Sequence, residues 1–217
     1  MAGMSAAIEC VDIQLDVVLL ESSGGVGGQI DDIPHAVRNV VAVPEGKTGL
    51  ADALMYHASM MGDRLHLGEV ATEVHLDAGL VVAGKYSYRA TTVLIATGSR
   101  RRELEAAPDG AFGGDVTYVA EPHLERFAGQ PMVVVGGGDS GVLDALTLAA
   151  TGSPVTLVHR SRQLSARSDL VANLRSEGRI ADMAGWTLQE VIGSDRLQGV
   201  IVSERTTNER RRLDTSG

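Results

Sequence analysis

Three glycines at a characteristic spacing follow a short apolar run near the middle of the chain. The run is Met132 to Val135, and Gly136, Gly138 and Gly141 come directly after it at GxGxxG spacing. A helix-like segment continues over 139–150. A strand, glycine turn and helix in this order bind a dinucleotide pyrophosphate, because the glycines allow the turn, the approach of the phosphates and close helix packing. The helix N-terminus then attracts the anion. A glycine-rich turn in some other α/β protein is the alternative interpretation.

Basic residues follow the second strand predicted for this unit. The strand is 154–158, and His159, Arg160, Arg162 and Arg167 come next. Many NAD sites place a carboxylate here for the ribose hydroxyls, whereas cations suit a 2′-phosphate through charge-assisted, bidentate hydrogen bonds. The pattern therefore favours NADP over NAD. An ordinary solvated basic loop is the alternative.

A carboxylate and a glycine-rich loop stand at comparable places in the first half. Glu21 ends a predicted strand at 16–20, as a carboxylate that binds an adenosine ribose would. The loop at 22–30 contains four glycines that would let it approach a flat cofactor. A flexible surface loop accounts for the same residues equally well.

Composition narrows the classes of partner and chemistry. A net charge of −9 and 3% aromatic residues disfavour nucleic acid and anionic membranes as partners. Cys10 is the single cysteine, which excludes an intramolecular disulfide, a redox pair or a cysteine-based zinc site within these residues, and the histidines lack metal-ligand spacing. Neither a membrane-length apolar run nor a signal peptide is visible, so a soluble cytoplasmic protein is expected.

The remaining patterns predict an α/β protein with two domains. Helices are expected at 5–13, 48–62 and 168–177, a β-meander at 64–97 that leads into a strand at 93–99, and a hairpin at 186–203. The stretch 100–114 is charged and then contains Pro and Gly, so the domain boundary is expected there.

The order of these segments resembles a known flavoprotein family. SAAIECVDIQLDVVLLE, GGQIDDIP, LIATGS, VVVGGGDSGVLDALTLA and VTLVHR follow one another as in the low-molecular-weight thioredoxin reductases. The likeness is closer to their relatives without a dithiol, the ferredoxin/flavodoxin–NADP reductases. It implies two Rossmann-like, three-layer domains, an FAD-binding one at 1–113 and an NADPH-binding one at 114–217. In the family, hydride passes from NADPH to FAD and then to a disulfide or a one-electron carrier.

The resemblance also implies roles for particular residues. On the FAD side these are Glu21 for the ribose, Gly27, Gly28 and Gln29 for the flavin loop, Val70 for the adenine, and Thr97 and Gly98 for the pyrophosphate turn. On the NADPH side they are Gly136, Gly138, Asp139, Ser140 and Gly141 for the pyrophosphate, and His159 and Arg160, with Arg162 behind them, for the 2′-phosphate.

Several family features lie outside the 217 residues, so both domains are expected to be incomplete. These features are the opening strand with its own glycine turn, the last NADPH-domain strand and the returning FAD segment. The opening strand would pair between 16–20 and 93–96, and each buried backbone group left unpaired costs about 1–3 kcal/mol. We therefore expect FAD to be held weakly or not at all. The family's CxxC is absent, with 118–122 in its region, and Ser161 replaces the second arginine of the phosphate motif.

Two functions remain open from the sequence. The first is an NADPH-dependent, flavoprotein-type oxidoreductase without a redox dithiol, which acts with an electron-carrier protein or a small-molecule substrate and forms a homodimer. The second is an FAD-less NADP-binding or non-redox protein, either a pseudoenzyme or an assembly partner. No residue is identifiable as a catalytic acid or base.

Overall fold

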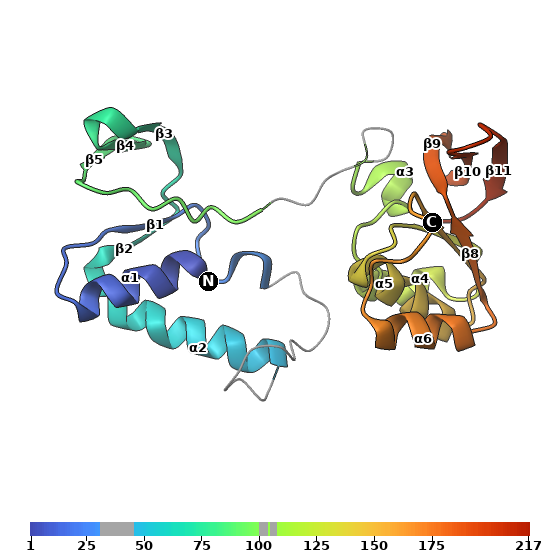
Figure 1. The fold of residues 1–217 in the computed structure, drawn as a ribbon, viewed down its shortest axis with the longest axis horizontal. Helices are drawn as coiled ribbons and strands as arrows, with labels where there is room; N and C mark the ends of the chain where they lie inside the picture. The colour runs from blue at the N-terminus through green and yellow to red at the C-terminus, as the bar shows by residue number, and fades with distance from the viewer. Residues whose placement is uncertain (31–45, 100–103, 105–107) are drawn as a thin grey trace. The chain divides into compact units, whose positions relative to one another are not determined.

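The structure, a computed structural model, describes residues 1–30, 46–99, 104 and 108–217. The chain forms two compact units, 1–100 and 101–217, which Figure 1 colours blue to green and yellow-green to red. The division between the two units lies after residue 100. Residues 110–116 are held by hydrogen bonds within the second unit, such as that from Gly110 N to Val116 O.

Two helices and a short parallel sheet make up the core of the first unit. The helices are α1 (Ala2–Asp12) and α2 (Gly46–Met61), and the paired strands are β1 (Leu19–Glu21) and β2 (Leu65–Leu67). Short 3₁₀ turns lie at Gly28–Ile30, Gly62–Arg64 and Leu76–Ala78. The buried core consists of Met4, Ala7, Ile30, Leu50, Leu54 and Met61.

The predicted meander is present in the first unit, but it is smaller than expected. Strands β3 (Ala71–His75), β4 (Leu80–Ala83) and β5 (Tyr86–Arg89) form an antiparallel sheet, whereas β2 pairs with β1 instead. The strand predicted at 93–99 is wrong, because no backbone hydrogen bond joins residues 91–98 to the rest of the described chain. The apolar residues of this segment have no neighbouring strand in the described chain with which to form the backbone hydrogen bonds of a sheet.

The second unit is a sandwich of three layers (Figure 1). Its central parallel sheet consists of β6 (Met132–Val135), β7 (Val155–His159) and β8 (Ile180–Ala184). Helices α5 (Asp139–Ala150) and α6 (Ser168–Ser176) cover one face, where Val142, Ala145, Leu148, Leu157 and Leu170 are buried. The shorter segments α3 (Ala111–Gly114), η4 (Glu121–His123) and α4 (Leu124–Phe127) precede the sheet in the chain.

An antiparallel sheet forms the third layer. It contains β9 (Trp186–Gly193), β10 (Leu197–Glu204) and β11 (Arg210–Asp214), and Val200 and Val202 pack with Val158 of the central sheet. The hairpin β9–β10 was predicted, but β11 was not, because its residues are mostly charged. Pairing with β10 forms this strand, and the Arg211 guanidinium lies 4.8 Å from the centre of the Trp186 ring, within cation–π range.

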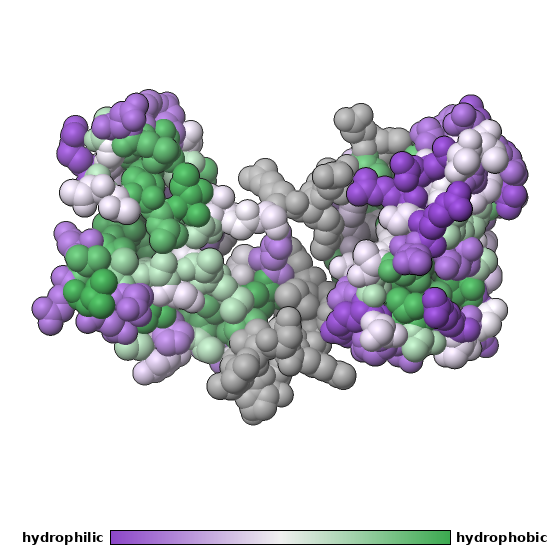
Figure 2. Space-filling view, in the orientation of Figure 1, coloured by the Kyte–Doolittle hydropathy of each residue, from purple (hydrophilic) through white to green (hydrophobic). Residues whose placement is uncertain are grey.

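The two units differ in how well they bury apolar side chains. Exposed large hydrophobic residues of the described chain, Leu94 and Ile95 among them, lie mainly in the first unit, and Figure 2 shows the hydrophobic surface there. Among the helices that the structure describes, none is long and apolar enough to cross a membrane.

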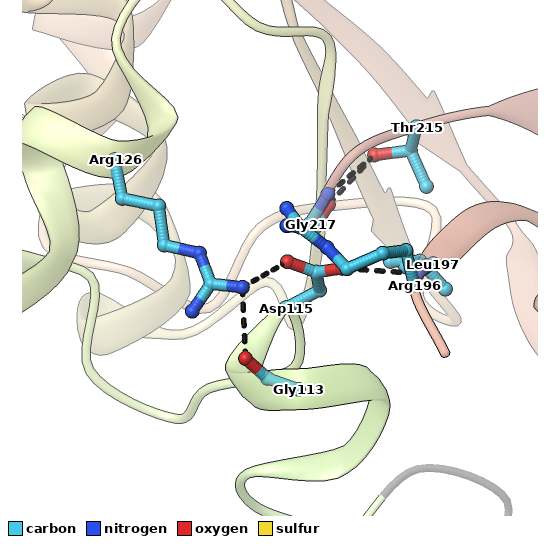
Figure 3. A network of polar contacts seen from close by, with 7 residues as sticks. All are labelled: Gly113, Asp115, Arg126, Arg196, Leu197, Thr215 and Gly217. Carbon is cyan, nitrogen blue, oxygen red and sulfur yellow. Dashed lines mark hydrogen bonds and ion pairs between the residues drawn. The ribbon is translucent and has the colours of Figure 1, made fainter. Parts of the chain in front are cut away.

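A buried carboxylate joins the start of the second unit to its antiparallel sheet (Figure 3). Asp115 is 1% exposed, and its Oδ2 accepts hydrogen bonds from Arg196 Nε at 2.6 Å and Leu197 N at 3.0 Å. Arg126 Nη2 donates to Asp115 Oδ1 at 2.5 Å and to Gly113 O at 2.9 Å. Burial raises the pKa of Asp115, but the hydrogen bonds from Arg196 and Leu197 and the charges of both arginines outweigh it and hold that pKa below its ordinary value.

We expect Asp115→Asn to destabilise the second unit by about 1–3 kcal/mol, because the Leu197 N–H and both guanidiniums lose a charged acceptor. Since folding lowers the pKa of Asp115, its contribution is present above the unfolded value of about 4 and is lost as the pH falls below it. The difference in the free energy of unfolding between wild type and Asp115→Asn should therefore become smaller at low pH.

Urea unfolding followed by the fluorescence of Trp186, the single tryptophan, measures this effect. Asp214→Asn is the control, because that side chain is 81% exposed and pairs only at the surface with Arg212. An equal difference in unfolding free energy at pH 7 and at pH 3 would show that the charge of Asp115 does not stabilise the second unit.

Candidate functional site

The glycine turn between β6 and α5 has the conformation that the spacing predicts. Gly136 has φ of 138° and donates its N–H to Val158 O at 3.0 Å, which attaches the turn to the end of β7. A Cβ on Gly141 would overlap the carbonyl oxygen of Gly136 and lie 2.9 Å from its carbon. Only glycine at position 141 therefore lets α5 begin so close to the turn.

The first turn of α5 presents its backbone N–H groups at this place. The hydrogen bond from Val142 N to Gly138 O, 3.0 Å long, is the first of the helix, so the N–H groups of Asp139, Ser140 and Gly141 precede the ladder. A Cβ on Gly138 would meet nothing closer than Ser165 Oγ at 3.8 Å. The space beside Gly138 is thus open, and a phosphate could approach the backbone there.

The loop after β7 is hydrogen-bonded to the glycine turn. Ser165 donates to Gly137 O through its N at 2.8 Å and its Oγ at 3.2 Å. Arg167 N donates to Asp139 Oδ1 at 2.7 Å, so this carboxylate holds the loop on the first turn of α5. The sequence interpretation did not include Ser165, and it placed Asp139 at the pyrophosphate.

His159 lies inside the unit, beneath the turn. It is 4% exposed, and its Nε2 lies 2.7 Å from Asp182 Oδ1 on β8. A Cβ on Gly137 would lie 3.0 Å from the His159 Cβ and 3.2 Å from its Nδ1, which explains the middle glycine of the run Gly136–Gly138. The imidazole ring of His159 therefore packs close to Gly137 of the turn. The contact with Asp182 fixes the orientation of this ring.

The two predicted phosphate-binding arginines lie in solvent. Arg160 and Arg162 are exposed, and no carboxylate of the described chain lies within ion-pair distance of either. Arg167, by contrast, pairs with Asp169 at 3.3 Å. The structure thus places two uncommitted cations directly after β7, beside the glycine turn.

Glu21 of the first unit is held at the end of β1. Its Oε1 accepts hydrogen bonds from Ser23 N at 2.9 Å and Ser23 Oγ at 3.0 Å, and from Ser22 Oγ at 3.3 Å. Burial raises the pKa of Glu21, but the hydrogen bonds from Ser23 and Ser22 outweigh it and lower that pKa below its ordinary value. The carboxylate is therefore charged at neutral pH and keeps Oε2 available for ribose hydroxyls.

Hydrogen bonds bring the other predicted residues of the first unit into two groups. Glu69 N donates to Glu21 O at 2.9 Å, which places Val70, 53% exposed, next to the end of β1. Gln29 Nε2 donates to the backbone oxygen of Ser99, so the loop with Gly27 and Gly28 meets the turn with Thr97 and Gly98. Each group combines a glycine or carboxylate with exposed backbone, which suits a dinucleotide.

The site residues that the sequence analysis did not identify contact partners that are distant in the sequence. Asp182 contacts His159 from the next strand, and Ser165 contacts Gly137 from across a loop. Parallel pairing of β7 with β8 was the one signal that could have found Asp182. Among the residues that the structure describes, no group of three or more His, Cys, Asp or Glu could hold a metal ion.

The two glycines at the helix start should respond differently to alanine. We expect Gly141→Ala to destabilise the second unit by about 1–3 kcal/mol, because its Cβ overlaps Gly136 O. Gly138→Ala, with open space at its Cβ, should keep wild-type stability while weakening NADP⁺ binding about tenfold or more.

Trp186 fluorescence in urea and calorimetric titration of NADP⁺ separate the two effects. If Gly138→Ala bound NADP⁺ as tightly as wild type, the phosphate would not approach the turn at that residue.

The comparisons with known proteins agree with this geometry. A family model described as pyridine nucleotide-disulphide oxidoreductase matches residues 1–216. The crystal structure of Lactococcus lactis thioredoxin reductase in its FR conformation has a TM-score of 0.83 and 26% sequence identity, over 100% of this chain and 72% of that chain. The α/β, Rossmann-like fold predicted from the sequence is therefore confirmed.

Relatives of known sequence include both reductase types that the motifs resemble. Listeria monocytogenes thioredoxin reductase is 28% identical over 201 residues, which cover 90% of this chain and 61% of that protein. Paraburkholderia phymatum ferredoxin–NADP reductase is 33% identical over 186 residues, which cover 80% of this chain and 52% of that protein. This chain thus spans less than two thirds of either relative. The match over nearly the whole chain shows that it belongs to the pyridine nucleotide-disulphide oxidoreductase family.

Proposed function

We propose that this chain is an NADPH-dependent oxidoreductase of flavoprotein type that works without a redox dithiol. The close approach of Gly141 to Gly136, which presents the first turn of α5 to a phosphate, carries the proposal. The domain assignment is part of it, with FAD in the first unit and NADPH in the second. Residues 110–113, which the sequence analysis assigned to the FAD domain 1–113, are hydrogen-bonded within the second unit, which otherwise matches the predicted NADPH domain 114–217. When bound, the nicotinamide supplies a hydride and the flavin ring accepts it.

The second unit binds and orients the nucleotide. The N–H groups of Asp139, Ser140 and Gly141 receive the pyrophosphate, aided by the dipole of α5. Arg160 and Arg162 attract the 2′-phosphate, since neither is neutralised by a carboxylate of the described residues. His159 supports the turn and keeps its ring out of solvent.

The first unit holds the flavin nucleotide through the two groups of residues described above. Glu21 accepts hydrogen bonds from the ribose through Oε2, because its Oε1 is already occupied by Ser22 and Ser23. Val70 would offer its backbone to the adenine. The Gly27–Gln29 loop and the Thr97–Gly98 turn, which the hydrogen bond from Gln29 to Ser99 brings together, would hold the pyrophosphate and the flavin.

The electron acceptor is an electron-carrier protein or a small molecule. The relatives named thioredoxin reductase and ferredoxin–NADP reductase both support a redox protein partner. Cys10, the single cysteine of the 217 residues, is half-buried in α1 and has no second thiol among them. A homodimer and a cytoplasmic location stay predictions.

We expect the wild-type protein to prefer NADPH to NADH, and Arg160→Ala to reduce NADPH affinity about tenfold or more. A charge-assisted hydrogen bond contributes about 1.5–3 kcal/mol, and each 1.4 kcal/mol is about tenfold in affinity. NADH affinity should not change, because NADH lacks the 2′-phosphate. Titration of both nucleotides, monitored by their fluorescence, measures the preference. Equal affinities that the variant leaves unchanged would support a solvated loop instead.

A second test separates an oxidoreductase from an FAD-less nucleotide-binding protein. With FAD in excess and without oxygen, the wild-type protein should accelerate the loss of flavin absorbance on addition of NADPH. Glu21→Ala should raise the FAD concentration needed for half the maximal rate, whereas Glu177→Ala, a half-buried glutamate of the second unit, should not. If saturating FAD and NADPH react no faster with the protein than without it, the FAD-less alternative holds.

A further inference from the structure

Unpaired arginines of the second unit gather at one place. Most arginines there form ion pairs, namely Arg126, Arg167, Arg179, Arg196, Arg210, Arg211 and Arg212. Within residues 108–217, Arg160, Arg162, Arg175 and Arg205 do not. Three of these four belong to the loop after β7 or contact it. In a chain with a net charge of −9, such a concentration of free cations indicates an anion site.

Arg205 reaches this place from the turn between β10 and β11. Its Nη1 donates to the backbone oxygen of Arg160 at 3.2 Å, so its guanidinium lies against the backbone of the loop that follows β7. The sequence separation of 45 residues hides this contact from motif analysis.

Backbone hydrogen bonds fix the turn that carries Arg205. Arg205 N donates to Gly185 O at 3.0 Å, and Gly185 N donates to His159 O at 2.8 Å and to Ser161 O at 3.3 Å. Gly185 thereby joins the β10–β11 turn to the end of β7. The position of the Arg205 backbone does not depend on its side chain.

Two carboxylates close to this turn in the chain or in the sheet have hydrogen-bond partners other than Arg205. Glu204 Oε2 accepts hydrogen bonds from Thr206 N at 2.7 Å and Thr207 N at 2.6 Å within its own turn. Asp182 lies 2.7 Å from His159 Nε2. Arg205 has no carboxylate partner among the described residues, and the hydrogen bond to Arg160 O uses only one of its five N–H donors.

We propose that Arg205 is a specificity residue that binds the 2′-phosphate of the nucleotide together with Arg160, in place of the guanidinium that Ser161 lacks. The inference rests on the proposed NADPH site. Two guanidiniums on separate backbone segments can donate to different oxygens of one phosphate, and each such charge-assisted bond adds affinity that a nucleotide without the phosphate does not gain.

The test uses 2′,5′-ADP and 5′-AMP, which differ in the 2′-phosphate, as calorimetric probes of the 217-residue protein. We expect Arg205→Ala to weaken 2′,5′-ADP binding about tenfold or more and to leave 5′-AMP unchanged. Arg205→Gln should also weaken 2′,5′-ADP binding, because glutamine carries no charge. Since glutamine can still donate a hydrogen bond to Arg160 O, this variant separates the charge of Arg205 from its contact with the Arg160 backbone. Arg175→Ala, at an exposed and unpaired arginine of α6, should match wild type.

Unchanged 2′,5′-ADP affinity in Arg205→Ala would overturn the inference while a wild-type preference for 2′,5′-ADP leaves the NADPH site intact. Wild-type affinity in Arg205→Gln would also overturn it, because Arg205 would then act only by holding the Arg160 backbone. If wild type itself bound both probes equally, the proposed phosphate site would fail, and the inference with it. Urea unfolding of each variant verifies that it is folded.

Discussion

The contact between Gly136 and Gly141 is the constraint on which the second unit's site depends. Because a Cβ on Gly141 would overlap Gly136 O, the residue at 141 decides how closely α5 begins beside β6. That closeness sets where the N–H groups of the first helical turn lie. The same turn takes hydrogen bonds from Ser165 and contacts the buried ring of His159, so the loop and β7 are positioned relative to it.

The layered fold explains why cations and N–H groups meet at one edge. β6, β7 and β8 are parallel, so their carboxyl ends share an edge, and ligands of open α/β sheets bind there. The third layer contributes to the same edge, because Gly185 ties the β10–β11 turn to the end of β7. The network around Asp115 is separate from these contacts. It joins the first residues of the second unit to Arg126 and to Arg196 in the turn between β9 and β10.

Local patterns predicted the parts of the structure that local physics determines. The glycine turn, α5, α6 and the β9–β10 hairpin follow from glycine spacing, helical periodicity and turn residues. The sequence could not reveal β11, since backbone pairing and the Arg211–Trp186 contact form it without an apolar pattern. The strand expected at 93–99 failed for the opposite reason, because its apolar residues have no partner strand in the described chain. In the site, Asp182 and Arg205 required three-dimensional neighbours to be recognised.

A crystal structure of the 217-residue protein with NADP⁺ bound would show whether the nucleotide binds at the glycine turn. We expect electron density for the pyrophosphate at the N–H groups of Asp139 to Gly141, with the adenosine 2′-phosphate beside the loop that follows β7. The ring of His159 should remain buried against Asp182. Density for the nucleotide away from the glycine turn, or a 2′-phosphate that points into solvent far from Arg160, would contradict binding at this turn.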